Sequence, residues 1–270
     1  MRERSLTHSI ALVVLALGFL TPALARRINE TPYEFRYEAR ISAGLSIEVN
    51  GVNGDLLVEE SEGSQVEVVA RKSGGLDDPS EVRMAVVEHD RGATICAVYP
   101  NGAQDAGRGC AAGGVTMPVG SDVKVDFTVR VPKGVKFVGR TSHGTVRAHR
   151  VSGGVEAHTV NGNIEIDGSG TVHATSVNGS IVAMMEPGTR GESRLQTVNG
   201  NLKLTLASLD PARLFAQTVN GGIDLAVPAA RTLEESAHHL VAQLGPAGSL
   251  YSPEIRMRTV NGDIRLEYRR

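Results

Sequence analysis

The chain has 270 residues, in which 28 Lys and Arg stand against 30 Asp and Glu, a formal net charge of −2 at pH 7. This balance excludes the clear basic excess of nucleic-acid-binding domains, and the length allows one or two domains with ample core. Aromatic residues make up 4% of the chain and Trp is absent, which argues against a glycan site built on ring stacking.

The first 25 residues have the pattern of a secretory signal peptide. Arg2 and Arg4 form a charged end, residues 10–20 form an apolar run, and Ala23-Leu24-Ala25 is a small-x-small cleavage site. The run is 11 residues long, too short to span a bilayer, and no later apolar stretch is long enough. We therefore expect a mature chain that begins near Arg26, in the periplasm or outside the cell, with no membrane span.

The two cysteines, Cys96 and Cys110, both lie in the part expected to be exported. In an oxidising compartment they are predicted to form a disulfide, and a loop of this size would stabilise the fold by about 3 kcal/mol. Two buried free thiols are the alternative. Without a nearby pair of His, two Cys do not make a zinc site.

Residues 26–131 are interpreted as an N-terminal β region. Apolar and polar residues alternate over 45–49, as half-buried strands require. A Gly- and Ala-rich loop bracketed by the cysteines follows later, and residues 123–131 predict one clean strand, which Pro132 ends.

Residues 132–270 repeat the string Thr-Val-Asn-Gly-x-Ile/Leu-x-Leu, and one outlying copy lies upstream. The Asn position is occupied by Asn53, His143, Asn161, Asn178, Asn199, Asn220 and Asn261. In the dense part the copies are about 20 residues apart, with a step of about 40 before the last. Thr or Ser lies two residues before each Asn position there, and apolar residues lie three and five residues after it. A period near 20 residues points to a repeat architecture in which each repeat is two short strands and two corners.

Two folds fit this repeat. Asn-Gly between alternating apolar residues favours a meander of hairpins, whereas side chains that recur position by position favour rungs stacked in parallel. The predicted fold class is all-β, a short parallel β-solenoid with an N-terminal β region and one inserted helix. In such a stack the Asn residues would adopt φ > 0 before Gly and form a corner ladder that passes side-chain hydrogen bonds along the axis, with Asn261 in the terminal rung.

The long step before Asn261 contains the predicted helix, residues 232–244. Thr232 can cap its start and Gly245 can end it. Its polar side would carry Glu234, Glu235, His238 and His239.

No residue is predicted to be catalytic, to bind a cofactor or to ligate a metal. The position four residues after each repeat Asn is occupied by Arg147, Glu165, Val182, Lys203, Asp224 and Arg265. On rungs ~4.8 Å apart these side chains would form a solvated charge ladder, whereas a glycosidase needs a close pair of carboxylates. The histidines at 143, 149, 158 and 173 fall on different faces, so they do not supply the converging ligands of a metal site.

The run Phe127-Thr128-Val129-Arg130-Val131-Pro132-Lys133-Gly134-Val135, followed by tandem Thr-Val-Asn-Gly-x-Ile, resembles the bacterial putative-adhesin domain of unknown function. This is a β-strand-repeat family related to the head domain of putative auto-transporter adhesins. The likeness covers about residues 41–270. It implies an exported β-solenoid without known enzymatic activity, with adhesion as the family's label and some members tied to envelope stress responses. The chain departs from the pattern at His143, in the Cys-bracketed loop and in the insertion before Ile255.

These observations predict an exported cell-envelope protein with a structural, adhesion or binding role. Its partner would be a cell-envelope protein or a glycan, and the Thr, Gln and Asn rows are the remaining route to glycan contact. Two rivals stay open: a carbohydrate-active lyase or hydrolase on the same fold, and an envelope-stress accessory protein that binds another envelope protein.

Overall fold

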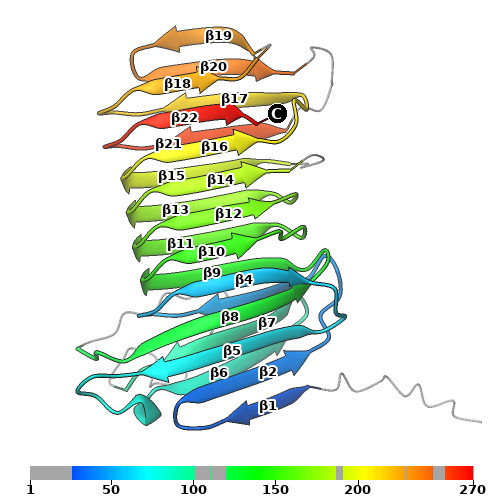
Figure 1. The fold of residues 1–270 in the computed structure, drawn as a ribbon, viewed down its shortest axis with the longest axis vertical. Coiled ribbons are helices and arrows are strands. Elements are labelled where there is room, and N and C mark those ends of the chain that lie inside the picture. Colours follow the sequence, from blue (N-terminus) through cyan, green and yellow to red (C-terminus); the bar gives the residue numbers. More distant parts are fainter. Residues whose placement is uncertain are drawn as a thin grey trace, which may run out of the picture.

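The computed structural model describes residues 26–100, 110, 120–186, 191–228, 230–245 and 253–269. The described part is all-β and consists of two sheets of 11 strands each, which we call sheet A and sheet B (Figure 1). The predicted signal peptide and most of the Cys-bracketed loop lie outside the described residues. One short 3-10 helix, η1 (Pro79–Glu81), precedes β6 (Arg83–His89), and no helix of the described part is long and apolar enough to cross a membrane.

The order of the strands across each sheet differs from their order in the chain. Sheet A runs β1 (Arg27–Glu30), β2 (Glu34–Ala39), β5 (Val66–Ser73), β8 (Lys124–Pro132), β4 (Leu56–Ser61), β10 (Val146–His149), β12 (Ile164–Gly168), β14 (Ile181–Met185), β16 (Leu202–Leu206), β22 (Ile264–Tyr268) and β18 (Ile223–Ala226). Sheet B runs β19 (Arg231–Ser236), β20 (His239–Leu244), β17 (Ala212–Gln217), β21 (Glu254–Arg258), β15 (Ser193–Asn199), β13 (Val172–Asn178), β11 (Val155–Asn161), β9 (Lys136–His143), β3 (Ser46–Asn50), β7 (Gly92–Val98) and β6 (Arg83–His89).

The core lies between the two sheets because each strand turns alternate side chains inward. Ile164 and Ile166 of β12 and Val155 and Ala157 of β11 are all buried, while the residues between them are partly exposed. Full burial of one such aliphatic side chain stabilises the fold by roughly 1.5–3 kcal/mol. The same positions are buried in the neighbouring repeats, so the core runs from one end of the stack to the other.

The repeats pair in parallel and in register. The strands β11, β13 and β15 end in the repeat Asn and pair with one another in chain order, so that Asn161 lies opposite Asn178 and Asn178 lies opposite Asn199. The shorter strands that follow the corners pair in the same way, with Ile164 opposite Ile181. Both sheets are nevertheless mixed, because antiparallel pairs close their ends, among them β1–β2, β6–β7 and β17–β20.

The N-terminal β region joins the same two sheets. β3 pairs in parallel with β9, and β4 pairs in parallel with β10. The outlying copy of the repeat therefore stacks on the dense ones, and Asn53 forms a parallel bridge to His143.

The last repeat of the sequence is not the last rung of the stack, contrary to the prediction for Asn261. β21 lies between β15 and β17, and β22 lies between β16 and β18, as Figure 1 shows where the red strands lie among the yellow ones. Asn261 accordingly bridges both Asn199 and Asn220. The reason is that β20 already pairs with one edge of β17, so β21 fills the position on its other edge.

The predicted helix at residues 232–244 is wrong. This segment forms the antiparallel hairpin of β19 and β20. Leu240, Ala242 and Leu244 lie in the core with a period of two, as in a strand that pairs with β17, and His239 and Gln243 between and beside them are partly exposed. Val241, on the outward side, is buried as well. Pairing with the open edge of β17 outweighs the helical capping signals of the isolated segment.

Candidate binding surface and the Asn-Gly corners

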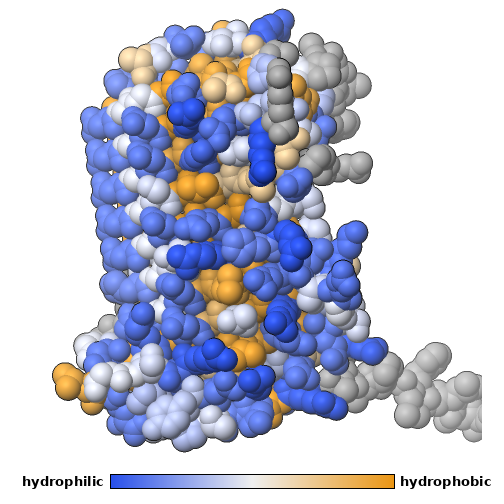
Figure 2. Space-filling model, in the orientation of Figure 1, coloured by the Kyte–Doolittle hydropathy of each residue, from blue (hydrophilic) through white to orange (hydrophobic). Residues whose placement is uncertain are grey.

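The corner asparagines form an unbroken chain of side-chain hydrogen bonds. Each amide nitrogen donates to the amide oxygen of the next rung: Asn178 to Asn161 at 2.9 Å, Asn199 to Asn178 at 2.8 Å, Asn261 to Asn199 at 2.7 Å and Asn220 to Asn261 at 2.8 Å. Asn53 donates instead to the carbonyl oxygen of Ser121 at 3.1 Å. Asn53 is partly buried, whereas the five asparagines of the hydrogen-bonded chain are exposed. Figure 2 shows a column of hydrophilic residues along the left edge, where the Asn-Gly corners stack.

The Thr or Ser two residues before each Asn position forms a second row of hydrogen bonds, inside the corner. Thr159 donates its hydroxyl to the carbonyl oxygen of Gly144 at 3.0 Å, and Ser176 donates to that of Gly162 at 3.0 Å. The same bond recurs from Thr141, Thr197, Thr218 and Thr259. These buried hydroxyls explain why that position accepts only Thr or Ser.

A third row, two residues after each Asn position, was missed by the sequence analysis, which treated it as variable. Side-chain oxygens in this row accept a backbone N–H from the next rung. The acceptors are Asp55, Asn163, Ser180, Asn201 and Asp263. Asp126 of β8 accepts in the same way from the N–H of Asp55, although no repeat Asn precedes it. The signal was present, because the residue after the repeat Gly is Asp, Thr, Asn or Ser in every copy except the one with Gly222, which lies in the outermost rung.

The expectation that the corner Asn residues adopt φ > 0 is wrong. Among the described residues, the one non-glycine residue with positive φ is Arg150, at 55°. Glycine follows Asn for a different reason, close approach of the next rung. A Cβ on Gly162 would lie 1.9 Å from the carbonyl oxygen of Gly144, and a Cβ on Gly179 would lie 1.9 Å from that of Gly162.

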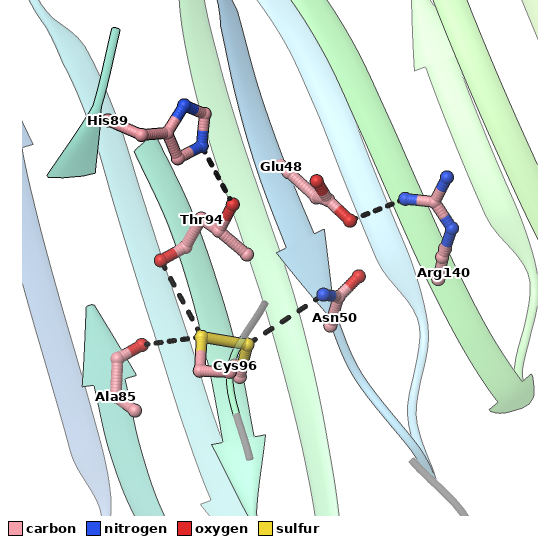
Figure 3. The surroundings of a disulfide bond; sticks show 8 residues. Glu48, Asn50, Ala85, His89, Thr94, Cys96 and Arg140 are labelled. Atoms are coloured by element: carbon pink, nitrogen blue, oxygen red, sulfur yellow. Dashed lines mark hydrogen bonds and ion pairs between the residues drawn. A yellow bond between two sulfur atoms is a disulfide. The ribbon is translucent and has the colours of Figure 1, made fainter. Parts of the chain in front are cut away.

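The predicted disulfide is confirmed. Cys96 and Cys110 are joined, with Cα atoms 5.6 Å apart. Cys96 points away from the core on β7, and the amide of Asn50 donates to its sulfur at 3.7 Å (Figure 3). Thr94, Cys96 and Asn50 face outward from sheet B yet are buried.

A network of charged side chains lies next to the disulfide on the outer face of sheet B. The guanidinium of Arg140 bridges Glu48, at 2.5 Å, and Glu156, at 2.7 Å. Glu156 also accepts from Lys136 at 2.8 Å and pairs with His158 at 3.2 Å. The charges of this network neutralise one another within the protein.

Two pKa values in this network depart from their ordinary ranges. Burial raises the pKa of Glu156, but hydrogen bonds from Lys136 and His158 and the charge of Arg140 outweigh it and lower the pKa to about 2. Burial lowers the pKa of His158, and Arg140 adds to this effect, against the opposing pull of Glu156.

The C-terminal half of the same outer face carries an open hollow of about 300 Å³. We call it the sheet B hollow. Its lining comes from β15, β17, β20 and β21 and consists of Arg194, Gln196, Phe215, Ala216, Gln217, His239, Arg256, Met257 and Arg258. Within it the pairing register places Arg194 and Phe215 on either side of Arg256. One row further on, Gln196 and Gln217 lie on either side of Arg258, and His239 lies beyond Gln217.

The arginines of the sheet B hollow differ in how far their charge is neutralised. Arg194 pairs with Glu192 at 2.5 Å, and Arg256 pairs with Glu254 at 2.5 Å. Arg258 makes no ion pair with any residue that the structure describes. The guanidinium carbons of Arg213 and Arg256 each lie 4.9 Å from the centroid of the Phe215 ring. The hollow therefore keeps a positive charge that no described acidic side chain offsets.

The outer face of sheet A differs, because its charged row is largely paired across rungs. Arg147 lies 3.5 Å from Glu165, and Arg265 lies 3.7 Å from Asp224. Lys203 pairs at 2.7 Å with Glu267, one row away. Figure 2, which looks onto this face, shows hydrophilic side chains interspersed with hydrophobic surface. Exposed pairs of this kind contribute under about 1 kcal/mol each.

The histidines are dispersed among separate partners. His149 pairs with Asp167 at 3.3 Å, His158 with Glu156, and His173 contacts the carbonyl oxygen of Glu192 at 2.9 Å. No group of three or more His, Cys, Asp or Glu in the described part of the chain is arranged to hold a metal ion.

The order of the rungs predicts unequal costs for removing corner amides. Asn261→Ala and Asn178→Ala each remove two side-chain hydrogen bonds, which we expect to cost about 1 kcal/mol. Asn220→Ala in the outermost rung removes one and should cost about half of that. Urea unfolding of the three variants measures this. A loss at Asn220 equal to or larger than that at Asn261 would contradict the observed order.

The close approach at the corners predicts that Gly179 cannot carry a side chain. Gly179→Ala drives Cβ against a backbone carbonyl that cannot rotate away, and we expect destabilisation on the order of 3 kcal/mol. The matched control is Gly63→Ala, where the nearest atom to a new Cβ is the hydroxyl of Ser61 at 3.7 Å. That change should alter the free energy of unfolding by less than about 0.5 kcal/mol. Similar costs for the two variants would refute the packing argument.

The shifted pKa values predict a loss of stability in acid. His158, with its lowered pKa, favours the folded state above its ordinary pKa of 6.5, and this contribution is lost as pH falls below it. Glu156 contributes above its ordinary pKa of 4.5 and loses that contribution as pH falls towards about 2. Denaturant melts between pH 8 and pH 3 should show both stages. Glu156→Gln should shrink the lower stage by ~2 kcal/mol after allowance for solvent screening. The exposed carboxyls whose pKa values are also lowered, those of Glu34, Asp78, Asp122, Glu192 and Glu267, keep their part of it.

The control for that experiment is Glu62→Gln, since Glu62 is exposed and makes no ion pair with any described residue. It should leave the acid stages unchanged. An unchanged lower stage in Glu156→Gln would show that another group titrates there.

No protein-family model and no curated protein matches this sequence. Among solved structures, the chain is similar to a putative cell adhesion protein from Clostridium sporogenes, with 10% identity, 88% of this chain and 100% of that chain covered, and a TM-score of 0.47. It is also similar to a putative adhesin from Bacteroides fragilis, with 10% identity, 88% and 98% covered and a TM-score of 0.33. A third, from Parabacteroides distasonis, has 12% identity, 87% and 97% covered and a TM-score of 0.32. All three are named as putative adhesins or adhesion proteins.

Proposed function

We propose that the chain is an exported, non-enzymatic protein of the cell envelope that binds its partner through the sheet B hollow. Its body is a short β-solenoid of stacked Asn-Gly rungs, closed by antiparallel strands at both ends. The parallel register of the repeats and the three rows of corner hydrogen bonds support this description of the fold. The rungs serve as a rigid support that holds outward side chains of distant repeats in straight rows.

The observation that carries the proposal is the uncompensated positive charge of the sheet B hollow. Arg258 faces solvent between Gln196 and Gln217 and has no ion pair in the described part of the chain. On sheet A, by contrast, Arg147 and Arg265 each have an acidic neighbour within 4 Å. An external partner could supply the negative charge that the protein itself does not place beside Arg258.

The composition of the hollow favours binding over hydrolysis. None of its described lining residues is a carboxylate, whereas glycoside hydrolysis needs two, one acidic and one ionised. The carboxylates on sheet A that could form such a pair, Glu165 and Asp224, each lie beside an arginine and belong to strands with three others between them. A general acid needs a raised pKa, which an adjacent guanidinium opposes.

The disulfide supports export. Disulfides persist in the periplasm and outside the cell and are rare in the cytosol. The bond between Cys96 and Cys110 agrees with the secretory pattern of residues 1–25.

Binding of purified, labelled residues 26–270 to cell envelopes of the producing bacterium tests the proposal. Arg258→Glu should weaken binding at least tenfold, because it reverses the charge of the hollow. Arg27→Glu on β1 of sheet A is the matched control, since Arg27 is exposed and makes no ion pair with any described residue. It should change binding less than twofold. Full binding by a correctly folded Arg258→Glu variant would overturn the proposal.

A further inference from the structure

We propose that the sheet B hollow binds the carboxylate groups of an acidic polysaccharide, that is, a glycan containing uronic acid. This inference rests on the proposed function and names the chemical class of its ligand. It follows from the side chains that the stacked strands bring together there.

Arg258 supplies the anchoring charge. Its guanidinium is a planar fork of donors that matches a carboxylate with two parallel hydrogen bonds. Arg194 and Arg256 are already occupied on one edge, because the Nε and Nη2 atoms of each donate to Glu192 and Glu254 respectively. Those acids hold two arginines in place, and Arg258 is the arginine of the lining that makes no ion pair with any described residue.

Amide side chains flank this arginine. Gln196, Arg258, Gln217 and His239 lie directly opposite one another on four neighbouring strands. At ~4.8 Å per strand this row is about 14 Å long, longer than a single sugar ring. An amide both donates and accepts hydrogen bonds, which suits the hydroxyl groups of a sugar on either side of its carboxylate. The hollow, at about 300 Å³, is at the lower end of the size range of small-ligand sites.

The aromatic ring in the hollow argues against a nucleic acid as the ligand. Proteins hold single-stranded nucleic acids largely by stacking bases on aromatic rings. Phe215 is the one Phe, Tyr or Trp of the described lining, and two guanidinium groups already lie 4.9 Å from its ring centroid. The same occupation disfavours a neutral glycan held by ring stacking. The chemistry that remains is charge and hydrogen bonding, which a uronate offers in one residue.

The experiment measures binding of oligogalacturonate to residues 26–270 by calorimetry in low salt. The free acid should bind, and the same oligosaccharide with its carboxyls methyl-esterified should bind at least tenfold more weakly. Arg258→Gln should also weaken binding at least tenfold. The neighbouring repeats carry Gln at this position, so the variant is compatible with the fold. Arg27→Gln, the matched control, should change nothing.

A second variant tests for a gain of binding. Gln196→Arg adds an arginine beside Arg258 at an equivalent position and should strengthen binding of the free acid a few-fold. Single-stranded DNA and dextran sulfate of matched charge form two further arms. We expect both to bind at least tenfold more weakly than the uronate.

The outcomes distinguish a failure of the assigned ligand class from a failure of the proposed function. Equal binding of the ester and the acid, or equal binding of DNA or dextran sulfate, would overturn the uronate assignment. If Arg258→Glu loses envelope binding while no uronate binds, the ligand class fails and the proposed function stands. If envelope binding survives Arg258→Glu, both fail.

Discussion

The contact on which the whole structure depends is the one between successive corners, where the hydroxyl of a buried Thr or Ser meets the glycine carbonyl of the neighbouring rung. Thr159 and Gly144 show it at 3.0 Å, and the spacing is so short that a Cβ on Gly162 would meet the same carbonyl. This contact allows one register, and a slip of one residue would turn every inward side chain outward. The continuous core and the straight outward rows both follow from it.

Much of this organisation could be predicted from residue identities, because equivalent positions in a stack have the same surroundings and need the same kind of residue in every rung. Recurrence of Asn, of Thr or Ser and of paired apolar residues indicated parallel pairing, and export indicated the disulfide. The rung order could not be predicted, since β21 and β17 carry equivalent residues and either could pair with β15. The helix at 232–244 was wrong because capping signals are local, whereas the edge of β17 that this segment covers is formed elsewhere in the chain. The sheet B hollow was missed for a related reason: Arg194, Phe215, His239 and Arg258 become neighbours only once that order is known.

The two outer faces show how one scaffold carries different surfaces. Inward side chains pack in the core and must be apolar in every repeat. Outward side chains do not carry this constraint and differ from rung to rung. On sheet A the variation places acids beside bases, as with Glu165 and Arg147, and the charges cancel. On sheet B the charges cancel around Glu156 at one end. At the other end the sheet B hollow keeps an excess of positive charge. The same corner geometry supports both, which separates the determinants of folding from those of recognition.

The position of the final repeat affects how the chain folds and how it responds to proteolysis. The residues of β21 and β22 are the last of the described strands to be synthesised, yet they form an inner layer of the stack. The protein therefore cannot be completed by simple addition of layers in the order of synthesis, because a site between β15 and β17 has to be open when the last segment arrives. For the same reason a protease that trims this chain from its C-terminal end removes an inner layer and leaves β17 and β18 without their neighbours. The places of β17 and β18 in the two sheets therefore depend on β21 and β22.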